Sequence, residues 1–286
     1  MGERVVVVSG ATGNVGRRVV GRLVGWGGVR VRVLSRDPGR AAGVGGEVVA
    51  GDFADPGGLR AALAGADAFF LVTSHPMRPE HDVNALAAAR ACGVRQVVKL
   101  SALAVTDPGA DDLLTRWQRD NEDRLTASGL DWTLLRPRAF MTNALAWADS
   151  VRSEGVVRAL YGDGRNAGVD PEDIAEVAAR VLTEAGHEGR AYALTGPRAL
   201  SAREQTERLG HVLGRSLRFV ELGEEEALAG WRARLPEPVA QALLHSARRL
   251  RDGAKAQVAE DVEAVTGRPP RDFEEWAVEH AAAFRP

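Results

Sequence analysis

The sequence predicts an α/β fold, in which helices cover both faces of a parallel sheet and a smaller, mostly helical lobe follows. Two observations support this prediction. Short apolar runs alternate with longer helical patterns up to about residue 195, as in sheets that are buried on both faces. From Leu200 onward helical patterns dominate. We expect a doubly wound sheet domain over residues 1–195, with 137–163 contributing to the lobe, and a substrate-binding lobe over 196–286.

Seven apolar runs read as strands, because each is short and is bounded by turn-forming residues. The predicted strands are Val5–Val8, Val29–Leu34, Val48–Phe53, Ala68–Ser74, Gln96–Ser101, Trp132–Arg136 and Ala191–Thr195. Pro137 closes the sixth strand. Continuous apolar strands separated by helices indicate parallel pairing.

Helical patterns occupy most of the intervals between these strands. The predicted helices are Arg17–Val24, Pro56–Ala64, Pro79–Ala91, Asp111–Ala127, Phe140–Arg152 and Asp170–Glu184. Asp55 before Pro56 is a helix start, because aspartate caps free backbone N–H groups and proline is tolerated in a first turn. Gly129 ends the fourth of these helices, since glycine is common just past a helix end.

Glycines spaced three apart follow the first strand directly, in Gly10-Ala-Thr-Gly13-Asn-Val-Gly16. Such a turn lets backbone approach a pyrophosphate closely, and the free N–H groups and dipole of the next helix face the phosphates. The alternative is a structural turn without a nucleotide. We predict a dinucleotide site whose phosphate-binding residues are Gly10, Thr12, Gly13, Asn14, Val15 and Gly16.

The end of the second strand favours NADPH as the cofactor. An acidic residue at this point binds the ribose of NAD, whereas an arginine accommodates a 2′-phosphate. The chain has Ser35 and Arg36 there, and Asp37 reads as part of a turn, which leaves NADH as the alternative. Other residues at strand ends are also expected to contact the cofactor: Asp52, Phe53, Thr73, Ser74 and Lys99.

Composition excludes several classes of protein. The net charge is −2 and basic residues are scattered, which argues against nucleic-acid or membrane-surface binding. No apolar stretch approaches the roughly 20 residues of a membrane span, and the N-terminus leads directly into a strand. Cys92 is the single cysteine, and no cluster of histidine, cysteine or carboxylate has the spacing of a metal site. We expect a cytoplasmic enzyme without a metal.

The order of motifs resembles the atypical short-chain dehydrogenases/reductases of the NmrA-like branch, which includes triphenylmethane and quinone reductases. The motifs are VVSGATGNVG (7–16), LSRDP (34–38), GDFAD (51–55), GVRQVVKLSA (93–102), RWQRDNEDRLTASGLDWTLLRPRAFMTN (116–143), GDGRNAGVDPEDIAEV (162–177) and YALTGPRALS (192–201). The resemblance implies a Rossmann sheet, NADP(H) in an extended groove and a substrate cleft beneath the lobe. It extends to ketoreductases of aromatic polyketide antibiotic pathways, while other members are regulators that bind the nucleotide without turnover.

The usual catalytic pair of the superfamily is absent. Orthodox members use a tyrosine as general acid and a lysine four residues later. The two tyrosines are Tyr161 and Tyr192, and neither is followed by a lysine at that spacing. The resemblance places Leu114 and Gln118 at the two positions. Substrates that need little help from an acid are therefore expected, because general acid catalysis is worth about 10²- to 10⁴-fold.

We predict an NADPH-dependent reductase of an activated carbonyl, either a polycyclic aromatic ketone or a quinone, with the proton supplied by substrate or water. The alternative is a regulator that senses NADP(H) and binds a protein partner. Three residues are the candidates for catalysis: Ser101, Gln118 and His75. An apolar pocket for the aromatic carbonyl substrate is expected from Trp117, Phe140, Met141, Asn143 and Trp147, although side chains at this spacing also suit a core.

Overall fold

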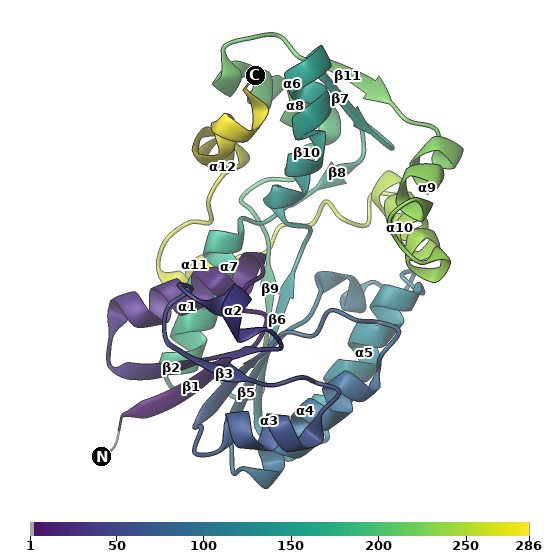
Figure 1. The fold of residues 1–286 in the computed structure, drawn as a ribbon. Coiled ribbons are helices and arrows are strands. Elements are labelled where there is room, and N and C mark those ends of the chain that lie inside the picture. The colour runs from purple at the N-terminus through teal and green to yellow at the C-terminus, as the bar shows by residue number, and fades with distance from the viewer. Residues whose placement is uncertain (1–2, 286) are drawn as a thin grey trace.

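The computed structural model describes residues 3–285, and seven parallel strands form its main sheet in the order β3-β2-β1-β4-β5-β6-β9 (Figure 1). The strands are β1 (Arg4–Val8), β2 (Val29–Ser35), β3 (Glu47–Ala50), β4 (Ala68–Leu71), β5 (Gln96–Leu100), β6 (Asp131–Pro137) and β9 (Arg190–Leu194). The predicted doubly wound α/β class is confirmed. The strand order reverses where β1 lies between β2 and β4, so a crevice opens at their carboxyl ends.

Two apolar cores lie on opposite faces of this sheet. Side chains alternate along a strand, so Val6 and Val8 of β1 enter one core and Val7 enters the other. The first core is covered by α1 (Asn14–Trp26), α2 (Pro38–Ala41), α7 (Pro171–Thr183) and α11 (Asp261–Thr266). The second is covered by α3 (Pro56–Leu63), α4 (Glu80–Ala91) and α5 (Leu113–Thr126), and a short 3₁₀-helix η1 (Leu103–Thr106) precedes α5.

The lobe lies above the carboxyl ends of the strands in Figure 1. Its helices are η2 (Met141–Trp147), α6 (Ala148–Glu154), α8 (Ala202–Leu213), α9 (Glu224–Arg232), α10 (Glu237–Arg251), α12 (Phe273–His280) and η3 (Ala281–Phe284). Its strands are β7 (Val156–Ala159), β8 (Arg165–Asn166), β10 (Leu200–Ser201) and β11 (Arg218–Glu221), which pair as β7 with β11 and β8 with β10. These strands were not predicted, because runs of two to four residues are too short to show a period. The helix predicted at Phe140–Arg152 is a 3₁₀-helix that continues as α6.

One segment of the C-terminal region returns to the sheet domain. Val262 of α11 is fully buried in the first core, and Asp261 accepts a hydrogen bond of 2.6 Å from the backbone N–H of Ala193. Arg268 lies 3.0 Å from Asp173 of α7. The region expected as a continuous lobe over 196–286 therefore includes a part that covers the sheet.

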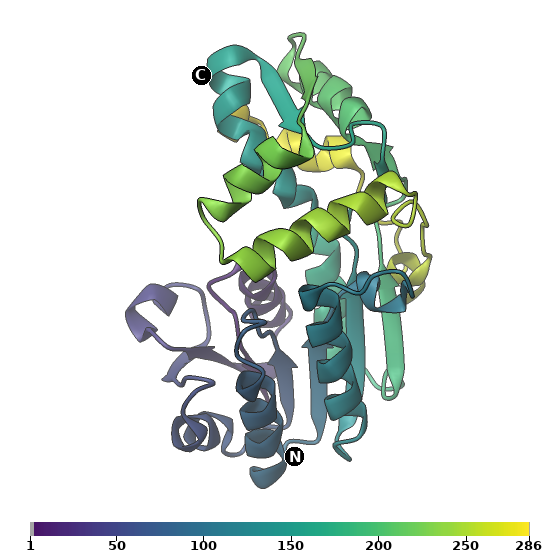
Figure 2. The same ribbon diagram turned by 90° about the vertical axis from the view of Figure 1, so that its right-hand side faces the viewer.

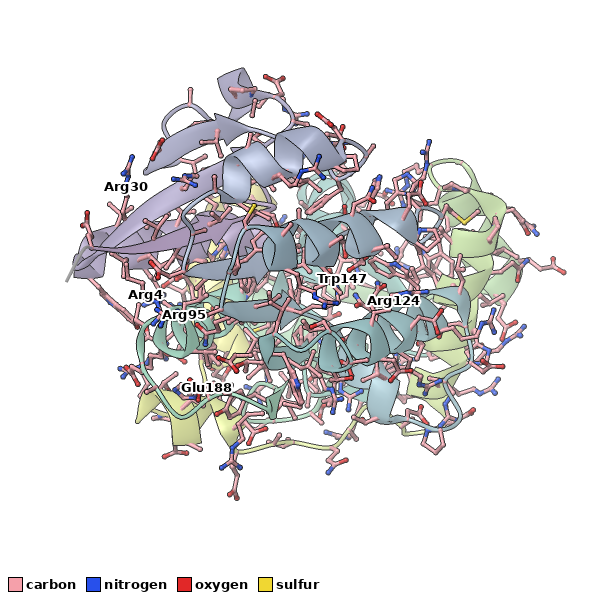
Figure 3. All side chains as sticks on the ribbon, turned by 90° about the horizontal axis from the view of Figure 1, so that it is seen from below. Arg4, Arg30, Arg95, Arg124, Trp147 and Glu188 are labelled. Atoms are coloured by element: carbon pink, nitrogen blue, oxygen red, sulfur yellow. The ribbon has the colours of Figure 1, made fainter. Side chains whose placement is uncertain are left out.

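Arginines at the amino-terminal edge of the sheet contact neighbouring polar or acidic side chains (Figure 3). Arg4 donates to Gln96 at 2.7 Å, and Arg95 forms an ion pair of 3.2 Å with Asp67. Arg30 pairs in the same way with Glu47. At the carboxyl edge, by contrast, the side chains of Arg36 and Arg40 have no such partners within residues 3–285. Within residues 3–285 no helix is both long and apolar enough to cross a bilayer.

Candidate functional site

A groove of about 330 Å³ lies at the carboxyl ends of β1 to β4. Most residues that the sequence predicts for the cofactor line it: Gly10, Thr12, Gly13, Ser35, Arg36, Asp52, Phe53 and Ser74. His75, a candidate for catalysis, lines it too. Sequence reasoning missed Arg40, in the four-residue helix α2, and His81, in the first turn of α4, because neither belongs to a recognised motif.

The geometry of the glycine turn suits a pyrophosphate. Gly10 has φ +63°, which side chains disfavour, and its carbonyl accepts a 2.9 Å hydrogen bond from the N–H of Gly13. A Cβ on Gly16 would lie 2.3 Å from that same carbonyl oxygen, so only glycine fits there. No side chain caps α1 and its first turn has no acidic residue, which leaves its N–H groups for an anion.

Three predicted residues at the start of α1, Asn14, Val15 and Gly16, do not line the groove. Val15 is buried in the first core with 3% exposure. The amide of Asn14 donates to the hydroxyl of Thr142 at 2.5 Å, and its oxygen accepts from Arg18 at 2.6 Å. Asn14 thus connects the start of α1 to the η2 helix of the lobe.

The charges at the end of β2 suit a 2′-phosphate. The Asp37 carboxylate caps α2 and accepts from the backbone N–H groups of Gly39 and Arg40 at 3.0 and 3.3 Å, as its predicted turn requires. Neither Arg36 nor Arg40 forms a side-chain hydrogen bond or ion pair within residues 3–285. The guanidinium groups of Arg36 and Arg40 can bind a 2′-phosphate, whereas the Asp37 carboxylate is already bonded to backbone N–H groups. This arrangement favours NADPH over NADH.

Thr73 and Lys99, predicted to contact the cofactor, instead belong to a buried ion pair. The Lys99 ammonium lies 2.8 Å from the Asp82 carboxylate and 3.3 Å from the Thr73 hydroxyl, which itself donates to Asp82 at 2.9 Å. The side chains of Lys99 and Asp82 are each 1% exposed. An unpaired charge at this depth would cost several kcal/mol, and α4 supplies the partner.

The Ser101 hydroxyl is likewise engaged in a buried hydrogen bond. Its hydroxyl donates to Glu122 of α5 at 2.5 Å, and Arg136 holds the same carboxylate at 2.5 and 3.0 Å. Gln118 is half-buried on α5, and its side-chain oxygen is buried without a partner among residues 3–285. Trp117 lies against the buried pair, with its ring centroid 5.9 Å from the Lys99 ammonium. Of the three candidates for catalysis, His75 lines the cofactor groove. Ser101 and Gln118 line neither this groove nor the cavity of the lobe.

Rings form the wall of the groove near His75. The centroids of His75 and His81 are 6.0 Å apart, and those of His81 and Phe53 are 5.9 Å apart. Such rings can stack with a planar group that enters the groove.

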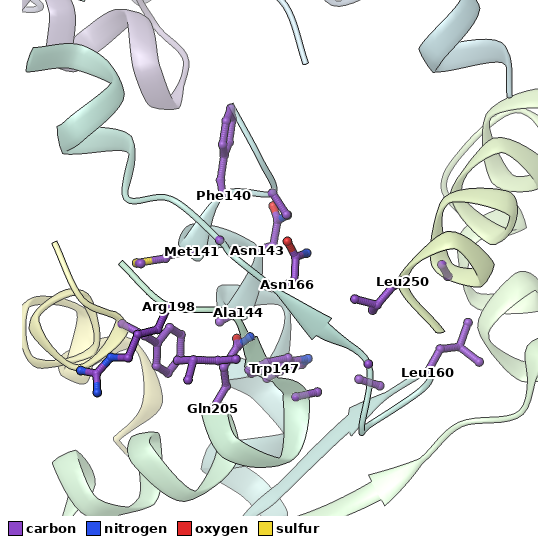
Figure 4. A pocket seen from close by; sticks show the side chains of 18 of the residues that line it. Phe140, Met141, Asn143, Ala144, Trp147, Leu160, Asn166, Arg198, Gln205 and Leu250 are labelled. Carbon is purple, nitrogen blue, oxygen red and sulfur yellow. The ribbon is translucent and has the colours of Figure 1, made fainter. Parts of the chain in front are cut away.

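A second, mostly apolar cavity of about 320 Å³ lies in the lobe (Figure 4). Four of the five predicted pocket residues line it: Phe140, Met141, Asn143 and Trp147. Trp117 does not line it. Sequence reasoning missed other lining residues, which come from distant segments: Leu160, Asn166, Gln205, Trp231 and Leu250. Phe140 also packs against the first core, so the cavity begins where the sheet domain ends.

Comparison with known proteins agrees with this geometry. The model of the NAD(P)H-binding family matches residues 10–185. A (4-alkanoyl-5-oxo-2,5-dihydrofuran-3-yl)methyl phosphate reductase of Streptomyces griseus is 54% identical over 99% of this chain and 100% of its own length. The NAD(P)H azoreductase of Xenophilus azovorans is 35% identical over 98% of this chain and 99% of its own length.

Among solved structures, the NADPH complex of an NADPH-dependent quinone oxidoreductase from Escherichia coli superposes with a TM-score of 0.86 and 27% identity. The superposition covers 97% of this chain and 99% of that one. The predicted resemblance and cofactor are confirmed. The chain therefore belongs to the NAD(P)H-binding family, in the NmrA-like branch of the atypical short-chain dehydrogenases/reductases, and is an NADP(H)-binding oxidoreductase.

Proposed function

We propose that this chain is an NADPH-dependent reductase of a carbon–carbon double bond conjugated to two carbonyl groups, in a phosphorylated alkanoyl-dihydrofuranone. The observation that carries the proposal is the 54% identity, over nearly the whole of both chains, to the Streptomyces griseus reductase of such a compound. The missing acid and the apolar cavity support it independently.

The chemistry of this substrate class explains why the acid is dispensable. In a (4-alkanoyl-5-oxo-2,5-dihydrofuran-3-yl)methyl phosphate, ring carbon 3 is conjugated to both the ring carbonyl and the alkanoyl carbonyl. Bound NADPH supplies a hydride, with the protein holding the two reactants in register. As a C–H bond forms at carbon 3, the π electrons move to carbon 4 and the charge spreads over both carbonyl oxygens. Water then protonates carbon 4, which completes reduction of the double bond.

The protein's own residues position the two reactants. The groove holds the dinucleotide at the carboxyl edge of the sheet, and Phe140 and Trp147 offer apolar surface for the alkanoyl chain. Ser101 is bonded to Glu122, so its hydroxyl is not free to act as a donor without breaking that contact. The tyrosine and lysine of orthodox members have no counterpart in this arrangement.

An aromatic ketone or quinone is the second candidate substrate. Its support is the aromatic part of the cavity wall, from Phe140, Trp147 and Trp231, together with the Escherichia coli quinone oxidoreductase fold. Quinones also accept hydride without a strong acid. The two candidates differ in the atom that receives the hydride.

The test offers the purified protein NADPH with each substrate class in turn. We expect kcat/KM for the phosphorylated dihydrofuranone to exceed that for a naphthoquinone or a polycyclic hydroxyketone by about 100-fold or more. Reaction in D₂O should place solvent deuterium on carbon 4 and none on carbon 3. A preference for the quinone, or solvent deuterium on carbon 3, would contradict the proposal, and NADPH binding without any oxidation would favour the sensing alternative.

A further inference from the structure

An arginine just past the end of β6 has no partner for its charge. Arg138 is half-buried, its Nε is shielded from solvent, and its side chain forms no hydrogen bond or ion pair within residues 3–285. Burial lowers the pKa of this guanidinium. Its neighbour Arg136, by contrast, forms a two-point ion pair with Glu122. A half-buried guanidinium without a protein counter-charge is suited to binding an anionic group.

A second cation lies near Arg138. The Lys255 ammonium donates to the hydroxyl of Ser246 on α10 at 2.6 Å, and no carboxylate of the described chain lies within ion-pair distance of it. Its pKa is lowered to about 8, mainly by burial and next by the charge of Arg138. A neighbouring positive charge disfavours the protonated form of a buried ammonium, whereas an anion bound between the two would favour it.

The nearest carboxylates are already bonded elsewhere. Asp107 accepts from both Nε and Nη2 of Arg249 at 2.8 Å, and the pKa of its carboxyl is lowered chiefly by this contact. Asp112 caps α5 and accepts from the backbone N–H groups of Leu114 and Thr115 and from the Thr115 hydroxyl at 2.7 Å. The negative charges of Asp107 and Asp112 raise the pKa of Lys255 and so oppose part of its lowering, but neither carboxylate forms an ion pair with Lys255.

The pair lies next in sequence or by backbone contact to residues that line the apolar cavity. Ala139 follows Arg138 and lines the cavity, as does Ala247, which follows Ser246. The carbonyl of Lys255 accepts from the N–H of Ala167 at 3.0 Å, and the preceding residue, Asn166, is a cavity residue as well. Figure 2 shows helix α10, in yellow-green, lying across the boundary between lobe and sheet domain.

We propose that Arg138 and Lys255 bind the phosphate group of the substrate while its ring and alkanoyl chain lie in the apolar cavity. This inference rests on the proposed function. A phosphate monoester is largely dianionic at pH 7, matching two cations. The planar guanidinium of Arg138 suits two-point bonding, and Lys255 adds a point charge. The site is separate from Arg36, which lines the cofactor groove, whereas neither Arg138 nor Lys255 does.

The test compares the phosphorylated dihydrofuranone with its dephosphorylated hydroxymethyl form. Arg138→Gln and Lys255→Met should each lower kcat/KM for the phosphorylated form by about 10- to 100-fold, mainly through KM, the scale of a charge-assisted bond. Neither should change kcat/KM for the hydroxymethyl form or the affinity for NADPH. Lys255→Arg keeps the charge and should restore most of the loss. Arg165→Gln, on an exposed arginine paired with Glu204, is the matched control and should have no effect.

The pH dependence supplies a second readout. KM for the phosphorylated form should stay level from pH 7 to about 8 and rise above it, as Lys255 loses its proton under the combined fields of Arg138, Arg249, Asp107 and Asp112. Lys255→Arg should abolish the rise. Wild-type protein that reduces both forms equally well, or variants that lose both equally, would overturn the phosphate subsite while leaving the double-bond reduction in place.

A binding measurement separates the two proposals if no dihydrofuranone is reduced. Protein saturated with NADPH, so that the groove is filled, is titrated with inorganic phosphate by calorimetry. Binding by wild type that is lost in Arg138→Gln and Lys255→Met would support the anion site even then. Equal phosphate binding by wild type and variants would overturn it.

Discussion

The cofactor groove and the substrate cavity are built from the chain in different ways. The groove is formed by residues 9–81, at the ends of the first four strands, and depends on backbone N–H groups and on glycines that admit no Cβ. The cavity draws side chains from segments spread over 139–273. A cofactor shared by a large family is thus held by local backbone geometry. The cavity that we propose for the substrate is instead lined by side chains that can change without disturbing the sheet.

The glycine turn offers the most severe test of this contrast. In Gly16→Ala the new Cβ would lie 2.3 Å from the Gly10 carbonyl oxygen and 2.6 Å from its carbon, so the turn between β1 and α1 must move. We expect NADPH affinity to fall by about 100-fold or more, together with a lower melting temperature. Calorimetric titration and thermal unfolding would measure both.

The same helix supplies the matched control. A Cβ on Gly21 would meet nothing within 4 Å. Gly21→Ala should leave NADPH binding unchanged and stabilise the fold by roughly 0.5–1 kcal/mol, since alanine favours helix. Equal changes in NADPH affinity for Gly16→Ala and Gly21→Ala would show that cofactor binding does not depend on close backbone approach at Gly16.

Arg36 tests whether a side chain adds selectivity to this backbone site. Arg36→Ala should weaken NADPH binding by roughly 10- to 150-fold for each charge-assisted bond lost, because the guanidinium has no other partner among residues 3–285. NADH affinity should hardly change. Arg30→Ala, which removes an arginine of β2 that is paired with Glu47 of β3, should change the affinity for neither cofactor. Equal losses for NADPH and NADH would assign Arg36 to the fold.

The same contrast explains what could be predicted from the sequence. The order of strands and helices and the groove at Gly10 to Gly13 follow from short-range patterns, and the structure contains them. The sequence shows Lys99 and Ser101 at the end of one strand, but it says nothing of the buried Asp82 and Glu122 that bind them. Those partners come from helices packed against the strands.

The lobe was harder to predict for a related reason. Its four strands have only two to four residues each, and their paired residues are 34 to 36 or 62 positions apart in sequence. Trp231 and Leu250 reach the cavity because α9 and α10 fold over it, which no local motif signals. Long-range packing is therefore what decides the substrate half of the site.

Trp147 tests the substrate side of the comparison with a smaller expected effect. Trp147→Leu removes aromatic surface from the cavity wall and should raise KM for the substrate by about 10-fold, since each buried aromatic contributes on the order of 1.5–3 kcal/mol. NADPH affinity should remain within about twofold. Trp26→Leu, at an exposed position on α1, should alter neither constant. Weakened NADPH binding in Trp147→Leu would mean that groove and cavity are coupled.

The smallest effects are expected at the two tyrosines, which in this family would otherwise be the first suspects for the general acid. The Tyr161 hydroxyl donates to Glu224, and burial together with that carboxylate raises its pKa, so it is a poor acid at neutral pH. Tyr192 shares a 2.7 Å hydrogen bond with His187, in the loop before β9 and thus at the amino-terminal edge of the sheet. Tyr161→Phe and Tyr192→Phe should each keep kcat within about threefold of wild type, because neither hydroxyl moves a proton to the substrate. Steady-state kinetics with the best substrate would check this, alongside thermal unfolding to confirm intact protein. A loss above about 10³-fold in either variant would identify a lost general acid and would remove the chemical reason for preferring an enolate-forming substrate.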